Sequence, residues 1–336
     1  MRRWLTPARL GALGLVVVAV FAVLYLTPSA DYIFLPDRAQ RLAEKVEVEG
    51  ERPDGDGGGI YYVEVRVRKA SILESRFPSL HEGSTLVPAH VYAPPGTSQK
   101  QRFQEDLQDM RRSQRIAAAV ALGEAGYDVE VVPTGVLVTT VFSDTPAAGK
   151  LRPGDVVITV DGERTKSPDA LGRRIRSQPP GSRVRLRVRR GDRTLAITLR
   201  TIAERDDPTR PIVGIGIEQA ATIQLPIKVE IDLGRVGGPS AGLAFALDIL
   251  EELGERVDRG RKIAATGEIA LDGSVRPIGG AKQKTIGARR AGVDIFLVPA
   301  GDNAAEARRY AGDLRIVPVK SFRQALRALA TLAKAG

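Results

Sequence analysis

The chain has 336 residues, enough for about two domains with a well-buried core. It carries 50 Lys and Arg against 40 Asp and Glu, a formal net charge of +10, and its hydrophobic content of 43% excludes wholesale disorder. With no cysteine and two histidines, His81 and His90, the sequence excludes disulfides and thiol nucleophiles and leaves little basis for a metal site, so we expect no cofactor.

The first predicted element is an N-terminal membrane helix. Residues 10–26 form an uncharged apolar run at the lower edge of the roughly 17–25 residues that cross a bilayer. Arginines precede this run, so the positive-inside rule leaves residues 1–9 as a short cytoplasmic N-terminus. We expect a transmembrane anchor over 10–27 at the cytoplasmic membrane, with everything after it extracytoplasmic. A cleaved signal peptide is the alternative, although Pro28 makes a poor cleavage site, and it exports the same residues.

Residues 31–126 combine a predicted strand with a long helix. The stretch 60–67 alternates apolar and polar residues after three glycines, which predicts a strand after a turn. Apolar residues at helical spacing predict an amphipathic helix over roughly 101–125. Both histidines lie in a proline-punctuated stretch, where the adjacent Glu82 is the only acidic partner that the local sequence suggests. We interpret the two histidines as surface or loop residues.

The next segment, residues 127–205, is rich in predicted strands. These are expected over 136–142, 155–160 and 183–189. Ser167 as cap and Pro168 at the first helical position predict a short helix over 168–177. In the strand 183–189, arginine alternates with valine and leucine, which is typical of a half-buried strand with a solvated arginine face. An exported chain rarely meets nucleic acid, so we expect no nucleic-acid partner.

The last segment, residues 206–336, alternates strands and helices. The apolar runs predict strands over 212–217, 225–231, 263–265, 295–298 and 316–319. The helical patterns predict helices over 240–253, 281–291, 303–310 and 321–332.

Two residues in this last segment could do chemistry without histidine. Ser240 follows three turn-forming residues and precedes an apolar helix, where helix amides could stabilise an oxyanion, although the same pattern fits a helix cap. On a helical wheel of residues 281–291, Lys284 falls on the small, apolar face and Lys282 on the solvated side. Burial can lower a lysine pKa from about 10.4 toward 7–8, where the neutral amine can activate a serine.

Three motifs, Gly238–Gly242, Thr266–Ile269 and Pro277–Lys284, resemble the proteolytic domain of Lon proteases in order and spacing. The resemblance implies Ser240 as the nucleophile, Lys284 as the base and Thr266 as a hydrogen-bond partner that orients the lysine. It also implies that the residues flanking the serine support the site: Gly238, Pro239 and Ala241.

Two features depart from the Lon pattern. Gly237 stands where many ATP-dependent members carry an acidic residue, so one electrostatic contribution is expected to be absent. The 336 residues also contain no P-loop motif, so we expect activity without ATP.

Residues 127–205 resemble the PDZ domains of exported proteases. Such domains add a peptide strand to a sheet edge and hold its terminal carboxylate on loop amides. The resemblance implies a carboxylate loop over 133–136 and a groove between the following strand and helix 168–177. The implied peptide-binding residues are Thr134, Gly135, Val136, Leu137 and Val138.

As a whole, the chain resembles the membrane-anchored, PDZ-containing Lon-like proteases of bacteria. The implied fold is α+β: a Lon-type domain of mixed sheets and helices, built from 31–126 and 206–336, carrying an inserted PDZ domain, a small barrel-like sandwich. The implied function is an ATP-independent serine endopeptidase that cleaves unfolded or extended polypeptides recruited by the PDZ domain. The alternative is a catalytically inactive, tethered peptide-binding scaffold. The implied partners are polypeptides and the membrane, and self-association into a homo-oligomer is left open.

Overall fold

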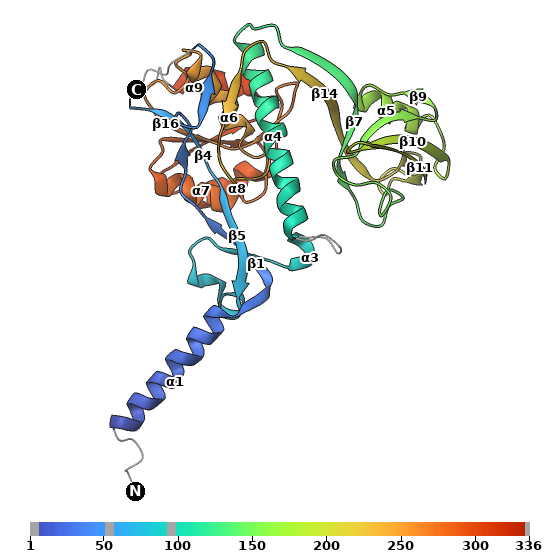
Figure 1. The fold of residues 1–336 in the computed structure, drawn as a ribbon. Helices are drawn as coiled ribbons and strands as arrows, with labels where there is room; N and C mark the ends of the chain where they lie inside the picture. The colour runs from blue at the N-terminus through green and yellow to red at the C-terminus, as the bar shows by residue number, and fades with distance from the viewer. Residues whose placement is uncertain (1–6, 51–56, 93–98, 333–336) are drawn as a thin grey trace. The chain divides into compact units, whose positions relative to one another are not determined.

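The computed structural model describes residues 7–50, 57–92 and 99–332, which form two units (Figure 1). Unit 1 is built from two segments, one up to Asp128 and one from Ile227 onward, and unit 2, Val129–Pro226, is inserted between them. Unit 2 extends beyond the boundary expected at residue 205, because the chain after that point returns to pair with the sheet of unit 2.

Helix α1 spans Pro7–Leu26, and nearly all of its side chains from residue 11 onward are exposed. Among the described residues, no helix combines the length and the hydropathy needed to span a bilayer. The predicted membrane span over 10–27 is therefore not supported. Of the predicted segment 1–9, residues 1–6 lie outside the described residues.

A three-stranded antiparallel sheet follows α1 in unit 1. Its order is β5, β1, β6, and residue Phe34 of the central strand pairs with Val67 on one side and Thr85 on the other. The alternating stretch 60–67 is thus not one strand: it divides between β4 and β5, which belong to different sheets. The elements of this region are β1 (Pro28–Pro36), β4 (Gly59–Tyr62), β5 (Val65–Ser71), α2 (Ile72–Arg76), η1 (Pro78–Leu80), β6 (Thr85–Val87) and α3 (Ala89–Tyr92).

A five-stranded sheet forms the centre of unit 1, in the order β2, β4, β16, β19, β20. Its last four strands run parallel, and every residue of β19 is buried, as expected for a strand covered on both faces. The strands are β2 (Gln40–Arg41), β16 (Lys262–Ala265), β19 (Ile295–Pro299) and β20 (Arg315–Val319). The helices of unit 1 that follow are α4 (Gln99–Glu124), α6 (Gly242–Glu252), α7 (Ala281–Ala291), α8 (Asp302–Tyr310) and α9 (Phe322–Leu332).

Two short strand pairs complete unit 1. Two of its helices can be compared directly with the predicted ranges. The pairs join β3 (Val46–Val48) to β15 (Val229–Ile231) and β17 (Glu268–Ile269) to β18 (Val275–Arg276). The helix predicted over 281–291 is confirmed with the same bounds, and the long helix predicted over 101–125 runs from 99 to 124.

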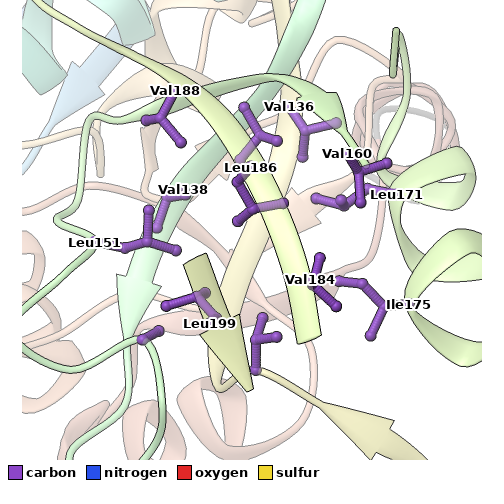
Figure 2. Close-up of a cluster of buried hydrophobic side chains, with 13 residues drawn as sticks. Val136, Val138, Leu151, Val160, Leu171, Ile175, Val184, Leu186, Val188 and Leu199 are labelled. Atoms are coloured by element: carbon purple, nitrogen blue, oxygen red, sulfur yellow. The ribbon is translucent and has the colours of Figure 1, made fainter. Parts of the chain in front are cut away.

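Unit 2 is built on a six-stranded sheet with the order β11, β10, β8, β7, β14, and β9 paired to β8. Valine and leucine side chains of these strands form a closed core with α5 (Figure 2). The predicted alternation of β10 is confirmed, and Ser167 caps α5 through its hydroxyl. The elements are β7 (Glu130–Val141), β8 (Val156–Val160), β9 (Glu163–Arg164), α5 (Pro168–Arg176), β10 (Arg183–Arg190), β11 (Arg193–Arg200), β12 (Ile202–Ala203), β13 (Pro211–Ile212) and β14 (Ile215–Gln224).

Candidate active site

Ser240 lies in a turn, two residues before helix α6 begins at Gly242. Ala241 occupies the N-cap position, and no side chain caps this helix. The predicted helix start at 240, and with it the interpretation of Ser240 as a cap, is therefore wrong. The tight turn places the serine side chain outside the helix, where its hydroxyl meets Lys284.

Four hydrogen bonds to the main chain of the turn hold it from two sides. The Gly238 amide donates to the Asp106 carbonyl at 2.7 Å, and the Ser113 hydroxyl donates to the Pro239 carbonyl at 3.0 Å. The Ser240 carbonyl accepts from both neighbours on the other side, which are the Thr266 hydroxyl at 3.0 Å and the Gly267 amide at 2.9 Å. The turn that carries Ser240 is thus fixed between helix α4 and the end of strand β16.

Thr266 acts differently from the expectation. Its hydroxyl donates to the main chain of Ser240, whereas the resemblance implied a bond to the lysine. Thr266 directly follows β16 and lies against the turn, so its side chain reaches the Ser240 carbonyl first. In the structure Thr266 therefore holds the main chain of Ser240 rather than the Lys284 amine.

Lys284 extends from the buried face of α7 and is 4% exposed. Its Nζ lies 3.1 Å from the Ser240 Oγ and donates a second hydrogen bond to the Val63 carbonyl. That carbonyl is available because the chain leaves β4 at this point, before it enters β5. Burial lowers the pKa of Lys284 to about 8, and the nearby Glu64 carboxylate opposes this by raising it.

Lys282 does not lie fully in solvent as the helical wheel predicted. It is half-buried, its Nζ donates to the Ser84 carbonyl at 2.9 Å, and it lies 5.4 Å from the centre of the Tyr310 ring. The segment 83–85 crosses this side of α7, and Gln283 also donates to it. The wheel could not show this covering segment, which comes from about 200 residues earlier in the chain.

The chemistry open to this pair follows from the two hydrogen bonds of the amine. A neutral amine has two N–H groups and one lone pair, so after one N–H is donated to the Val63 carbonyl the lone pair remains available to accept the Ser240 proton. With a pKa of about 8, roughly one lysine in ten is neutral at pH 7. The pair can therefore transfer a proton from the serine to the lysine near neutral pH.

An oxyanion formed next to Ser240 could accept hydrogen bonds only from backbone amides that are not already donating. The amides of Gly238, Gly242 and Leu243 already donate to main-chain carbonyls. The candidates next to the nucleophile are therefore the amides of Ser240 and Ala241, rather than the first helical amides.

The structure gives a physical reason for glycine at position 237. A Cβ on Gly237 would lie 2.7 Å from the Asp106 Cβ on helix α4, closer than real contacts allow. The half-buried Asp106 occupies this space, and burial raises the pKa of its carboxyl. Glycine at position 237 is thus required by the packing of α4 on the turn that carries Ser240.

Glu64 belongs to the site although the sequence gave no signal for it. In the alternating stretch it falls on the polar face, as a solvated strand residue would. The Gln40 side-chain amide donates to its Oε1 at 2.8 Å, and the Tyr62 hydroxyl donates to the Gln40 Oε1 at 3.1 Å. Burial raises the pKa of Glu64, and the Lys284 amine lowers it. Glu64 is therefore the carboxylate that acts on the protonation of the lysine.

His81 lies in a loop and is partly exposed, as expected, but its acidic partner is Glu74 rather than the adjacent Glu82. Its Nε2 lies 2.5 Å from Glu74 Oε1, and Glu74 is fully buried. Glu74 also accepts two hydrogen bonds from Arg68, which is the main cause of its lowered pKa. His90 is exposed on α3, as expected. Within the described ranges, neither histidine hydrogen-bonds to Ser240 or Lys284.

The structure does not place the predicted PDZ residues at a free edge. Residues 133–136 lie inside strand β7, which pairs with β8 on one side and β14 on the other. Leu137 pairs with both neighbours, Gly135, Val136 and Val138 are buried, and Thr134 falls at a register shift opposite Ala220 and Ala221. Val136 and Leu137, which are paired on both sides, therefore leave no edge to which a peptide strand could add.

Strand β14 offers the free edge instead. It ends the sheet of unit 2 on this side and contacts helix α5. Gly214 directly precedes β14 with a φ of 82°, a backbone conformation that favours glycine. The domain boundary expected at residue 205 had assigned β14 to the other domain, so the sequence analysis did not consider this edge.

Comparison with known proteins finds a match in each of the two units. Residues 213–331 match the Lon protease (S16) C-terminal proteolytic domain, and residues 121–201 match the PDZ domain. The chain therefore combines a Lon-type proteolytic domain with a PDZ domain in a mixed α+β fold. Ser240, Thr266 and Lys284 all lie in the matched proteolytic region, and the match supports a serine protease.

The similar proteins cover only parts of the chain. Lon protease 1 of Sorangium cellulosum is 40% identical over 94 residues, 27% of this chain and 11% of that protein. The Lon protease of Chloroflexus aggregans is 35% identical over 117 residues, 33% of this chain and 14% of that protein. The PDZ domain of the SdrC-like protein of Listeria monocytogenes is 29% identical, covering 26% of this chain and 92% of that one, with a TM-score of 0.25. The chain thus spans about a seventh or less of the curated relatives it matches.

Proposed function

We propose that this protein is a serine endopeptidase in which Ser240 is the nucleophile and Lys284 the general base. The observation that carries the proposal is the buried amine of Lys284, 3.1 Å from the Ser240 Oγ. Neutral Lys284 accepts the hydroxyl proton as Oγ attacks the peptide carbonyl, and the resulting ammonium returns that proton to the leaving amine. Water then hydrolyses the acyl-enzyme with Lys284 again accepting a proton.

The proposed substrates are unfolded or extended polypeptides, cleaved without ATP. The absence of a P-loop motif from the 336 residues supports independence from ATP. The PDZ-like unit would bind a polypeptide along the free edge of β14, beside α5. The competing function is a peptide-binding scaffold that does not cleave.

We also propose, independently of the peptidase activity, that α1 holds the protein at the cytoplasmic membrane with both units outside. Large apolar side chains are exposed along α1, such as Leu15 at 73% and Val18 at 68%, and such a surface needs an apolar cover. Protease added to intact cells should then remove both units. Protection of both units until the cells are lysed would contradict this location.

The first test is cleavage of casein by the full chain, with and without ATP. Ser240→Ala should abolish turnover while peptide binding by unit 2 remains, because the hydroxyl is the only group removed from the site. ATP should change the rate of the unaltered protein by less than about twofold. A protein that binds peptides but never cleaves would favour the scaffold.

In Glu64→Gln, the rise of kcat/KM with pH that accompanies deprotonation of Lys284 should occur at lower pH. The carboxylate raises the pKa of Lys284, so its removal leaves more neutral amine at pH 7 and raises kcat/KM there. The matched control is Glu82→Gln, which removes a carboxylate paired with Arg289 and Arg290 on the exposed end of the same helix. If this rise occurred at the same pH in Glu64→Gln as in the unaltered protein, or shifted equally in Glu82→Gln, Glu64 would not set the pKa of Lys284.

A further inference from the structure

Strand β10 of unit 2 presents a row of exposed arginines that the proposed peptidase function does not use. Its outward residues are all arginine, while the valines and leucine between them point into the core. Arg200 of β11 pairs directly with Arg183 and so lies on the same face. We name this set the arginine face: Arg183, Arg185, Arg187, Arg189 and Arg200.

No acidic side chain lies opposite the arginine face on β11. The residues paired with Arg185, Arg187 and Arg189 there are Thr198, Ala196 and Thr194, respectively. Within the described part of the chain, none of the five arginines forms an ion pair. Arg190, at the end of the same strand, shows the contrast: it is half-buried and paired with Asp155 at 2.7 Å.

Two carboxylates at the turns that flank the strands do not neutralise the face. Asp161 accepts hydrogen bonds from the Arg185 main-chain amide and the Gln178 side chain, so its oxygens are engaged at the turn after β8. Asp192 lies in the hairpin turn at one end of the two strands. Like charges on neighbouring positions repel, so the face gains free energy from an external anionic partner.

The shape of the face selects among anionic partners. The outward side chains of β11 between Arg193 and Arg200 are short, so the arginines stand on a flat, open surface rather than in a groove. The only aromatic residue of unit 2 is Phe142, directly after β7, so the face has no ring on which nucleic-acid bases could stack. A flat array of guanidinium groups suits a plane of phosphates, which each group can bind with two hydrogen bonds.

We propose that the arginine face binds the phosphate headgroups of an anionic phospholipid bilayer. The proposal goes beyond the peptidase activity and does not depend on it. Binding by such a face is electrostatic, so it weakens as salt is added. It would hold unit 2 at a charged membrane surface in a way that hydrophobic attachment by α1 does not provide.

The test compares binding of the full chain to vesicles of phosphatidylcholine alone and of phosphatidylcholine with phosphatidylglycerol. Helix α1 can bind to both kinds of vesicle, so the measured quantity is the ratio of the affinity for anionic vesicles to that for neutral ones. Arg185→Gln with Arg187→Gln should lower the affinity for the anionic vesicles by about 30-fold and leave the neutral vesicles unchanged. Raising the salt concentration should reduce the ratio for the unaltered protein.

The matched control is Arg173→Gln with Arg176→Gln, which removes two exposed arginines from α5 of the same unit. The control should keep most of the anionic preference. An equal loss in both double variants would mean that net charge alone acts, and an unchanged ratio in Arg185→Gln with Arg187→Gln would overturn the proposal. Tighter binding of a single-stranded oligonucleotide than of anionic vesicles would overturn it as well. Casein cleavage without vesicles reports separately on the peptidase.

Discussion

Lys284→Met is expected to lower kcat/KM for an unfolded peptide by about 10²–10⁴-fold, the usual contribution of a general base. Methionine has a similar length and suits a site that is 4% exposed, so the fold should persist while the proton acceptor is lost. Steady-state cleavage together with a thermal melt of each protein measures the two effects separately.

Lys282→Met is the control for this prediction. Its amine donates to the Ser84 carbonyl and lies against the Tyr310 ring, and it does not contact Ser240 in the described structure. The expected loss of activity is within about threefold, together with a small loss of stability. If Lys282→Met abolished cleavage and Lys284→Met did not, the assignment of the base would be wrong.

Gly287→Ala should lower the free energy of unfolding by about 3 kcal/mol, the upper end of the usual cost of overpacking. A Cβ at this position of α7 would lie 1.9 Å from the Asp37 carbonyl oxygen and 3.0 Å from a methyl of Val63. The first obstacle is main chain, so either α7 or the segment after β1 must move. Denaturant unfolding of the full chain measures the change.

Gly123→Ala provides the matched control, because it makes the same substitution in helix α4, where an added Cβ meets nothing within 4 Å. Alanine is favoured over glycine in a helix by roughly 0.5–1 kcal/mol, so this variant should be slightly stabilised. Equal stability of the two variants would show that α7 does not pack on the Asp37 carbonyl as described.

The sequence was informative where local pattern decides the structure. The small, apolar face of residues 281–291 predicted both the helix and the burial of Lys284, because a 3.6-residue period directly reports which side chains face the core. The alternation of 183–189 did the same for β10, with its buried valines and exposed arginines. The pairing of Ser240 with Lys284 came from the Lon-like motifs, and the two groups lie within hydrogen-bond distance.

The remainder depends on contacts between distant segments, which a local pattern does not contain. Glu64 faces Lys284 only because the chain leaves one sheet for another at Val63, and a single alternating run gave no sign of that break. The free edge of unit 2 falls on β14 because this late strand covers β7. Likewise, the partner of His81 is Glu74, which a capping box at the start of α2 holds in place.

The central claim is that a neutral Lys284 activates Ser240. The pH dependence of kcat/KM for an unstructured peptide tests it most directly. Because the neutral amine is the active form and burial lowers its pKa to about 8, the rate should fall about tenfold per pH unit below that value and level off above it. A profile that is flat between about pH 6 and 9, or that still rises steeply above pH 10 as an unburied lysine would make it, contradicts the account.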